Sequence, residues 1–538
     1  MQNLPTGIQF FERIRKENYL YVDKTEQILK LIENGDCYFF SRPRRFGKSL
    51  TLSTLEAMFK GKAELFKGLY AEEWVKEQSK HPSGVIRLDM GHLTAYYNKK
   101  ELNDSVVFYL EKFIEKNELD ILFNQEAGKL LLNIIGGLYD RFGSVVVLID
   151  EYDKPMTDNI DNLEKANEMR GFLRSFYGLL KDLDEVKFIF ITGVSKFSKV
   201  GVFSGLNNLK DISMVKEYGD IVGYTQKELE DNFSEWIEET SKELKTTKEK
   251  LLKMIKKHYD GFSFDGIVRL YNPFSILNFF QDKRFDNYWY DSATPSFLAK
   301  YFKTHKINDS DAYRHLKVKS NFTKASEIEH ASPESFLFQT GYLTIEKWDY
   351  KRNIITLDYP NEEVKESFPQ LYLFNIYNIT DYITLAEEIW NSLKIGDIEN
   401  VVDVFNGMLA RIPYDDFVNE KIDTNLFNSV QQKKLEDLMY SKKEKWYRSL
   451  FIMLISALKL QTFPETHTNQ GRPDVVISFR KQIVIIEFKL AKKSKDVPTK
   501  KKEGEEQIKK YLPAYEGKNK KIITAVFVAD DEKREVMY

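Results

Sequence analysis

Residues 39–50 read Phe-Phe-Ser-Arg-Pro-Arg-Arg-Phe-Gly-Lys-Ser-Leu, and this stretch decides the fold of the region around it. The apolar run from Cys37 to Phe40 enters it as a buried strand would. Gly47-Lys48-Ser49 closes it, and leucine and methionine residues then follow at helical spacing. The order strand, loop, Gly-Lys-Ser and helix predicts a phosphate-binding P-loop.

In a P-loop, backbone N–H groups and the helix N-terminus cradle the phosphates of a nucleotide. Lys48 is expected to reach the β- and γ-phosphate oxygens, and Ser49 to hold Mg²⁺. The usual first glycine of the motif would fall at position 42, which is Arg42. The alternative is a basic turn before an amphipathic helix. The residues predicted to bind ATP in this segment are Arg45, Phe46, Gly47, Lys48, Ser49 and Leu50.

A second strand supplies the carboxylates that a nucleotide hydrolase needs. Residues 144–149 form a continuous, β-branched apolar run that ends in Asp150-Glu151. Ligands bind beyond the carboxyl ends of strands in open α/β sheets. Asp150 is therefore predicted to bind the nucleotide's Mg²⁺, and Glu151 to be the catalytic base that activates water. An ordinary strand that ends in solvent-facing acids is the alternative.

A third strand, Val186 to Ile191, runs into a polar segment. Thr192 is predicted to sense the γ-phosphate, with Ser195 as the second choice. Hydroxyls that only cap the next segment would look the same in the sequence.

Several long stretches resemble the AAA-ATPase-like proteins of bacteria, over roughly residues 4–360. In those proteins the loop likewise reads Arg-Pro-Arg-Arg-Phe-Gly-Lys-Ser, so Arg42 fits this family. The resemblance implies an α/β P-loop NTPase fold (AAA/STAND-like) that binds ATP. The matching stretches are Asn18–Thr25, Ser41–Leu50, Ile149–Pro155, Ile191–Ser195, Tyr259–Phe262, Tyr271–Ser275 and Gln339–Thr344.

Residues 471–489 carry a different chemistry. They contain two strand patterns, Asp474–Phe479 and Ile483–Ile486, the second followed by Glu487-Phe488-Lys489. A hairpin would bring Asp474 and Glu487 to one sheet edge, and period-two geometry puts Glu487 and Lys489 on one face. Two carboxylates and a lysine can bind Mg²⁺ and orient a hydroxide for attack on a phosphodiester. The alternative is a surface hairpin with an Asp474–Lys489 ion pair.

This segment resembles the PD-(D/E)XK nuclease superfamily, and Gln507 with Tyr511 resembles the Gln-x-x-x-Tyr element of its RecB-like branch. The resemblance implies a C-terminal α/β restriction-endonuclease-like domain, in which Asp474 and Glu487 hold the metal. A last strand, Ile522–Val528, fits the same core. The residues predicted to be catalytic here are Asp474, Glu487, Lys489 and Gln507.

An additional carboxylate is expected near this site, because such sites often use one. Glu444 stands near the start of an amphipathic helix that covers Trp446 to Leu458, and Glu465 follows that helix. Glu465 is preferred because it is nearer the hairpin along the chain.

The charge distribution and the composition indicate which classes of partner and which cellular location to expect. Residues 431–538 carry 24 lysine and arginine against 15 acidic residues, a net charge of +9, which leaves −11 for residues 1–430. A basic segment favours a phosphodiester partner, namely nucleic acid, with DNA preferred, although a lysine-rich solvated loop at 489–502 would give the same count. The single cysteine, Cys37, excludes a disulfide framework. No signal-like start and no apolar run long enough for a membrane are present, so a cytoplasmic protein is expected.

Four regions are predicted: 1–220 as the P-loop domain, 221–360 as a helical or winged-helix region, 361–430 as a helical connector, and 431–538 as the nuclease-like domain. A winged-helix hairpin is expected near 336–358. The arginines of the loop could contact phosphates, in the same subunit or from a neighbour in a homo-oligomer, or pair with acids.

The sequence thus predicts an ATP-binding and ATP-hydrolysing protein coupled to a Mg²⁺-dependent nuclease. The first alternative is a nucleotide-dependent switch or scaffold whose nuclease-like domain binds DNA or a partner without cleaving. The second is a simple ATPase with a basic tail.

Overall fold

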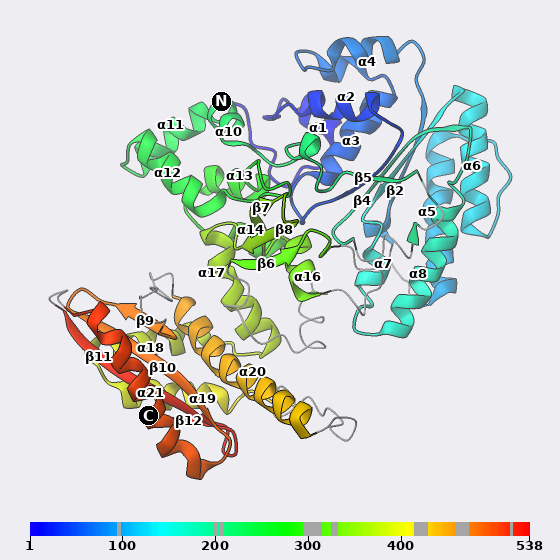
Figure 1. The fold of residues 1–538 in the computed structure, drawn as a ribbon. Coiled ribbons are helices and arrows are strands. Elements are labelled where there is room, and N and C mark those ends of the chain that lie inside the picture. Colours follow the sequence, from blue (N-terminus) through cyan, green and yellow to red (C-terminus); the bar gives the residue numbers. More distant parts are fainter. Residues whose placement is uncertain are drawn as a thin grey trace. The chain divides into compact units, whose positions relative to one another are not determined.

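The computed structural model of the protein describes residues 1–93, 98–196, 202–203, 206, 208–293, 298, 315–323, 332–413, 429–458, 473–516 and 520–538. These residues divide into two units, the first extending to Lys365 and the second running from Glu366 to Tyr538 (Figure 1). Among the described residues, no helix combines the length and the apolar composition needed to cross a bilayer. The predicted boundaries at 220, 360 and 430 stay predictions.

The first unit is built on a five-stranded sheet with the order β2-β3-β4-β1-β5, in which every strand pair is parallel. All residues of β1 and β3 are buried, as expected for a parallel sheet covered on both faces. The carboxyl ends of β1, β3 and β4 therefore lie side by side. The strands are β1 (Cys37–Ser41), β2 (Gly84–Asp89), β3 (Val145–Asp150), β4 (Val186–Gly193) and β5 (Lys210–Asp211).

Two groups of helices cover this sheet (Figure 1). The first group packs around α3 and comprises α1 (Phe11–Lys16), α2 (Thr25–Glu33), α3 (Lys48–Phe59), η1 (Ala63–Phe66) and α4 (Glu72–Gln78). The second group comprises α5 (Lys99–Asn117), α6 (Ala127–Phe142), α7 (Lys154–Thr157) and α8 (Leu163–Gly178). A short 3₁₀ turn, η2 (Met90–His92), follows β2.

The rest of the first unit is mostly helical. Thr225 forms a capping box with Glu228, which starts the first α-helix of this part of the chain. Leu270 and Tyr271 form isolated bridges, and Asn272 caps the helix that Pro273 starts. The helical elements are η3 (Lys216–Tyr218), α10 (Gln226–Asn232), α11 (Ser234–Glu243), α12 (Lys248–Tyr259), α13 (Pro273–Asp282), α14 (Tyr288–Ala293) and α16 (Pro333–Thr340).

The hairpin predicted near 336–358 is present. Strands β7 (Thr344–Asp349) and β8 (Ile354–Asp358) are antiparallel and follow α16 directly. Strand β6 (Leu316–Lys319) pairs with β8 to complete a three-stranded sheet.

The second unit holds a four-stranded sheet with the order β12-β11-β10-β9. Helix α21 packs on β10 and β11, while the aromatic ring of Phe451 on α20 packs against Phe488 and Phe527. Strand β10 runs to Ala491, beyond the predicted end at Ile486, so Glu487 and Lys489 lie within the strand. The elements are α20 (Ser429–Ser456), β9 (Val475–Ser478), β10 (Gln482–Ala491), η9 (Ser494–Asp496), α21 (Val497–Tyr511), η10 (Leu512–Ala514), β11 (Lys521–Asp530) and β12 (Glu535–Met537).

The segment predicted as a connector packs within this second unit. Gln482 donates to the carbonyl of Leu393 at 2.7 Å, and Asn406 exchanges two hydrogen bonds with the backbone of Val536. These contacts join the connector helices to β10 and β12 of the C-terminal sheet. The elements here are α17 (Glu362–Gln370), which crosses the division between the units, the π-helical turn η6 (Leu371–Ile376), α18 (Tyr382–Ile395) and α19 (Ile398–Leu409).

Candidate functional site

The P-loop connects β1 to α3 with two residues in the left-handed region. Arg45 has φ 66° and Gly47 has φ 99°, and α3 begins at Lys48 directly after that glycine. Alternating backbone conformations of this kind turn successive N–H groups toward one concave side, which suits an anion. The dipole of the helix adds positive potential at the same point.

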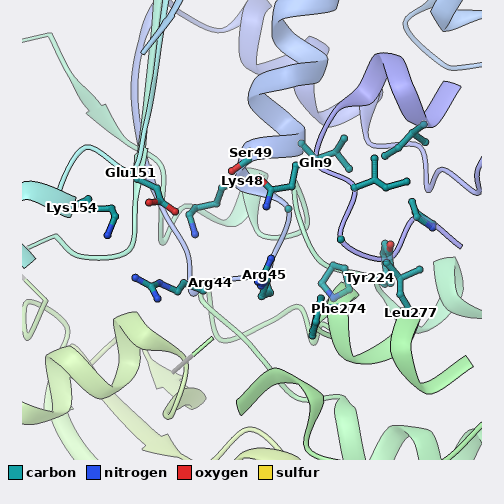
Figure 2. Close-up of a pocket in the computed structure, with 17 residues that line it drawn as sticks. Gln9, Arg44, Arg45, Lys48, Ser49, Glu151, Lys154, Tyr224, Phe274 and Leu277 are labelled. Atoms are coloured by element: carbon teal, nitrogen blue, oxygen red, sulfur yellow. The ribbon is translucent and has the colours of Figure 1, made fainter. Parts of the chain in front are cut away.

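A cavity of about 400 Å³ opens beside this loop. Figure 2 shows Lys48, Ser49 and Glu151 together in one part of it, with Tyr224, Phe274 and Leu277 in another part. The volume falls in the range of small-molecule sites, and the lining is charged at one end and apolar at the other. The lining residues are Pro5, Gly7, Ile8, Gln9, Ile14, Arg44, Arg45, Gly47, Lys48, Ser49, Leu50, Glu151, Lys154, Tyr224, Pro273, Phe274 and Leu277.

Lys48 is only 7% exposed and folds back over its own loop. Its Nζ donates to the carbonyls of Arg42 at 2.8 Å and Pro43 at 2.9 Å. Burial lowers the pKa of Lys48 to about 8, because the charged amine loses hydration that Asp150 and Glu151 only partly replace. A phosphate oxygen near Nζ would restore the charge, which fits the predicted role.

Asp150 is 1% exposed and is held in place by its neighbours. Thr192 Oγ1, at the end of β4, donates to Asp150 Oδ1 at 2.8 Å. Arg87 Nη2 lies 3.3 Å from Asp150 Oδ2. Neither Asp150 nor Thr192 lines the cavity of about 400 Å³, and the hydroxyl of Thr192 is bonded to Asp150.

Glu151 faces the cavity with a backbone φ of 48°, an uncommon value for a residue with a side chain. Burial raises the pKa of its carboxyl, and the nearby Asp150 and Asp89 raise it further, while Lys48 opposes them. Gly91 in η2 leaves the room that this carboxylate occupies, since an ideal Cβ at that position would lie 2.5 Å from Glu151 Oε2. A partly desolvated carboxylate in a cavity is suited to accept a proton from water.

Two further residues of the predicted nucleotide set, Phe46 and Ser195, do not line the cavity of about 400 Å³. Phe46 is fully buried against Phe262 and Phe264, so only its backbone can serve the loop. Ser195, the second choice as sensor, donates its backbone N–H to Asp153 at 2.8 Å, away from Asp150.

Arg42 has a structural place, and of the two roles left open for the loop arginines, its burial does not fit contact with a phosphate. Its side chain is 1% exposed and its guanidinium lies over the rings of Phe40 at 4.5 Å and Phe264 at 4.1 Å. Burial lowers its pKa to about 9. Arg44 and Arg45, by contrast, line the cavity.

In the second unit, the predicted nuclease residues come together. The antiparallel register pairs Val475 with Ile486, which makes Asp474 and Glu487 neighbours across the hairpin. Lys489 Nζ donates to Glu487 Oε1 at 3.0 Å, so these two side chains share one face of β10.

Glu487 is the most deeply placed of these groups, at 1% exposed. Burial raises its pKa to about 7, with Asp474 adding to the shift and Lys489 opposing it. Its Oε2 is buried and accepts no hydrogen bond from the residues that the structure describes. A buried carboxylate oxygen without a donor is the kind of group that a divalent cation satisfies. The residues present therefore fit a metal site.

Two more charged groups approach from α20, and both belong to one helical face because they are four residues apart. Glu444 Oε2 accepts from the backbone N–H of Leu490 at 3.1 Å, and burial raises its pKa. Arg448 Nη1 donates to Asp474 Oδ1 at 2.8 Å. The structure thus places Glu444 at the site, while the preferred Glu465 lies outside the described residues.

Gln507 and Tyr511 lie on α21, and the amide of Gln507 donates to the Tyr511 hydroxyl at 2.9 Å. Burial raises the pKa of Tyr511, and the charges of Glu487 and Asp474 raise it further. Gln507 is thus bonded to a phenol on which the charges of Glu487 and Asp474 act, and its predicted catalytic role stays a prediction.

Comparison with known proteins agrees with both geometries. Residues 5–203 match the family described as Predicted AAA-ATPase, and residues 442–538 match the PD-(D/E)XK nuclease superfamily. A protein of Azotobacter chroococcum mcd 1, described as an uncharacterized protein in the vnfD 5′ region, is 33% identical over 496 residues. That alignment covers 91% of this chain and 89% of the relative. The chain belongs to the AAA-ATPase-like family.

Two solved structures are similar to this AAA-ATPase-like protein at a greater distance. The Walker-type ATPase PABY2304 of Pyrococcus abyssi is 13% identical, with a TM-score of 0.33, and the match covers 68% of this chain and 97% of that one. Orc1 of Aeropyrum pernix, solved in complex with DNA, is 11% identical, with a TM-score of 0.23 and coverage of 64% and 92%. Both likenesses are too distant to assign a role to any residue.

Sequence reasoning missed three residues of these sites. Arg87 lies on β2, the strand that pairs with the strand of Asp150, and Gly91 follows β2. Neither residue belongs to a recognisable motif, so the sequence carried no signal for them. Arg448 had a usable signal, because it lies four residues after Glu444 on a predicted amphipathic helix.

Proposed function

We propose that this AAA-ATPase-like protein binds and hydrolyses ATP and couples that reaction to a Mg²⁺-dependent nuclease acting on nucleic-acid phosphodiesters, with DNA preferred. The observation that carries the proposal is the assembly of two separate sites in one chain. Lys48, Ser49 and Glu151 surround one cavity, and Asp474, Glu487 and Lys489 gather on one hairpin.

At the ATP site, Lys48 would bind the terminal phosphates and the loop N–H groups would hold the others. Ser49 and Asp150 would hold Mg²⁺, which neutralises phosphate charge when bound. Glu151 would accept the proton of the attacking water, and its raised pKa suits that task. Thr192 would keep the Asp150 carboxylate oriented.

At the nuclease site, Asp474 and Glu487 would hold a divalent cation, with Glu444 as the additional carboxylate. The bound cation would supply an activated water and stabilise charge on the phosphate. Lys489 lies 3.0 Å from Glu487, where its amine can orient the nucleophile or contact a phosphate oxygen. Gln507 would position the substrate from α21.

Cleavage of labelled single- and double-stranded DNA and RNA tests the proposal, with Mg²⁺ or Mn²⁺ and with or without ATP. We expect cleavage that is lost in Glu487→Ala and that changes with ATP in the wild type but not in Lys48→Ala. Cleavage that Lys48→Ala leaves unchanged in its response to ATP would refute the coupling alone. No cleavage under any condition would refute the nuclease.

The second candidate function is a nucleotide-dependent switch or scaffold that binds DNA or a partner through its nuclease-like domain. One observation favours it: both oxygens of Asp474 already accept hydrogen bonds, from Arg448 and from the N–H of Phe488. Metal binding that Asp474→Ala removes, in a protein that cleaves nothing, would support this function.

A further inference from the structure

The ion pair between Arg448 and Asp474 occupies the nuclease site itself. Arg448 Nη1 lies 2.8 Å from Asp474 Oδ1, and the two side chains are 18% and 16% exposed. The other oxygen, Asp474 Oδ2, accepts from the N–H of Phe488 at 2.8 Å. Asp474 therefore reaches the site with each oxygen already engaged by the protein.

Glu487 presents the opposite arrangement next to it. Its Oε1 accepts from Lys489, whereas its buried Oε2 has no donor among the described residues. A cation held by Glu487 and Asp474 together would lie close to the guanidinium of Arg448, because both would contact one carboxylate. Like charges at a few ångströms in a partly desolvated site repel strongly.

We propose that Arg448 is a displaceable cation, which pairs with Asp474 until a divalent metal takes that carboxylate and which then binds a phosphate of the nucleic acid. The proposal rests on the proposed nuclease function and concerns the regulation of that site. Metal binding and substrate binding would then favour each other. The metal frees Arg448 from Asp474 to bind a phosphate, and the phosphate draws the charge of Arg448 away from the metal.

The chemistry of arginine suits this exchange. Arg448 contacts Asp474 through one hydrogen bond, from Nη1 to Oδ1. Because a planar guanidinium binds a phosphate as readily as a carboxylate, Arg448 can exchange this single bond for contacts to a phosphate. The backbone of Arg448 is held in place near the site, because Glu444 on the same helical face accepts a hydrogen bond from the backbone N–H of Leu490. Only the side chain of Arg448 needs to move.

Mn²⁺ titration of the full-length protein by calorimetry tests the first part of the proposal, the competition between Arg448 and the metal for Asp474. We expect Arg448→Gln to bind Mn²⁺ about tenfold more tightly than the wild type, since a cation no longer competes for Asp474. Arg448→Lys keeps the charge and should bind like the wild type. Glu487→Gln gives the contribution of any other metal site in the chain.

Lys443→Gln is the matched control. Lys443 lies on the same helix and pairs with Asp531 at 2.9 Å, with both side chains 19% exposed. Its removal should leave Mn²⁺ affinity unchanged. Equal or weaker affinity in Arg448→Gln than in the wild type would overturn the exchange, because Arg448 would then be only a support for Asp474. No Mn²⁺ binding by any form would overturn both the exchange and the nuclease.

Binding of a short labelled DNA duplex in Ca²⁺, measured by anisotropy over a range of salt concentrations, tests the second half. Arg448→Gln should weaken binding and lower the slope of log K against log salt by about 0.9, the share of one phosphate contact. Lys443→Gln should leave the slope unchanged. An unchanged slope in Arg448→Gln would overturn the phosphate contact.

Discussion

Replacing Gly91 with alanine should separate ATP binding from ATP hydrolysis. An ideal Cβ at Gly91 would lie 2.5 Å from Glu151 Oε2, whereas an ordinary contact needs about 3.4 Å. The carboxylate must therefore move by about 1 Å, and a displacement of that size costs on the order of 10²-fold in rate when it affects a reacting group. The fold should survive, because the atom that yields is the end of a flexible side chain.

Steady-state ATP hydrolysis and equilibrium binding of a fluorescent ATP analogue measure the two effects. We expect Gly91→Ala to lower kcat about a hundredfold and to change nucleotide affinity by less than about threefold. Gly136→Ala on α6 is the control, since its Cβ would meet nothing within 4 Å. Hydrolysis by Gly91→Ala at the rate of Gly136→Ala would refute the assignment of Glu151 as the base.

Three further outcomes follow from buried groups. Thr192→Val should lower the ATP hydrolysis rate tenfold or more, because a hydrogen bond to the charged Asp150 is worth about 1.5–3 kcal/mol. Thr54→Val is the control. It removes a buried hydroxyl that is bonded to a helix carbonyl, and it should leave the rate unchanged. ATP affinity measured by calorimetry should fall as pH rises through about 8, since Lys48 must regain a proton to bind phosphate, and Lys48→Met should bind weakly with no such pH dependence. The folded-state pKa of Glu487 lies above its ordinary value of 4.5, so the metal-free protein should lose up to about 3 kcal/mol of stability between pH 4.5 and pH 8. Glu487→Gln should remove that loss of stability, which hydrogen exchange of the amides in β10 would measure. Equal protection of the wild type and Glu487→Gln at pH 8 would contradict the raised pKa of Glu487.

Much of the proposed ATP site could be predicted because its residues lie close together in the chain. A buried strand, a glycine with positive φ and a helix that starts at Lys48 follow one another within a few residues. Asp150 was predictable for the same reason, as the end of an apolar strand. The sequence left two roles open for Arg42. Its backbone still bonds to Gly193, so the pleat of β1 continues and turns the side chain of Arg42 to the side of Phe40.

The nuclease site shows where such reasoning stops. Period-two alternation correctly put Glu487 and Lys489 on one face and Phe488 on the other. The sequence could not decide between Glu444 and Glu465, because the distance along the chain does not tell which residues pack against the sheet. The pairing of Arg448 with Asp474 depends on how α20 packs, which no short-range pattern encodes.

The two ends of the cavity of about 400 Å³ are formed by different parts of the chain. One contiguous loop and Glu151 form the charged end, while residues near Pro5–Ile14, Tyr224 and Pro273–Leu277 form the apolar end. Substitutions in these scattered segments can reshape the pocket for the base without disturbing the phosphate chemistry. If a nucleotide binds here as proposed, its base preference could change through segments outside the P-loop motif.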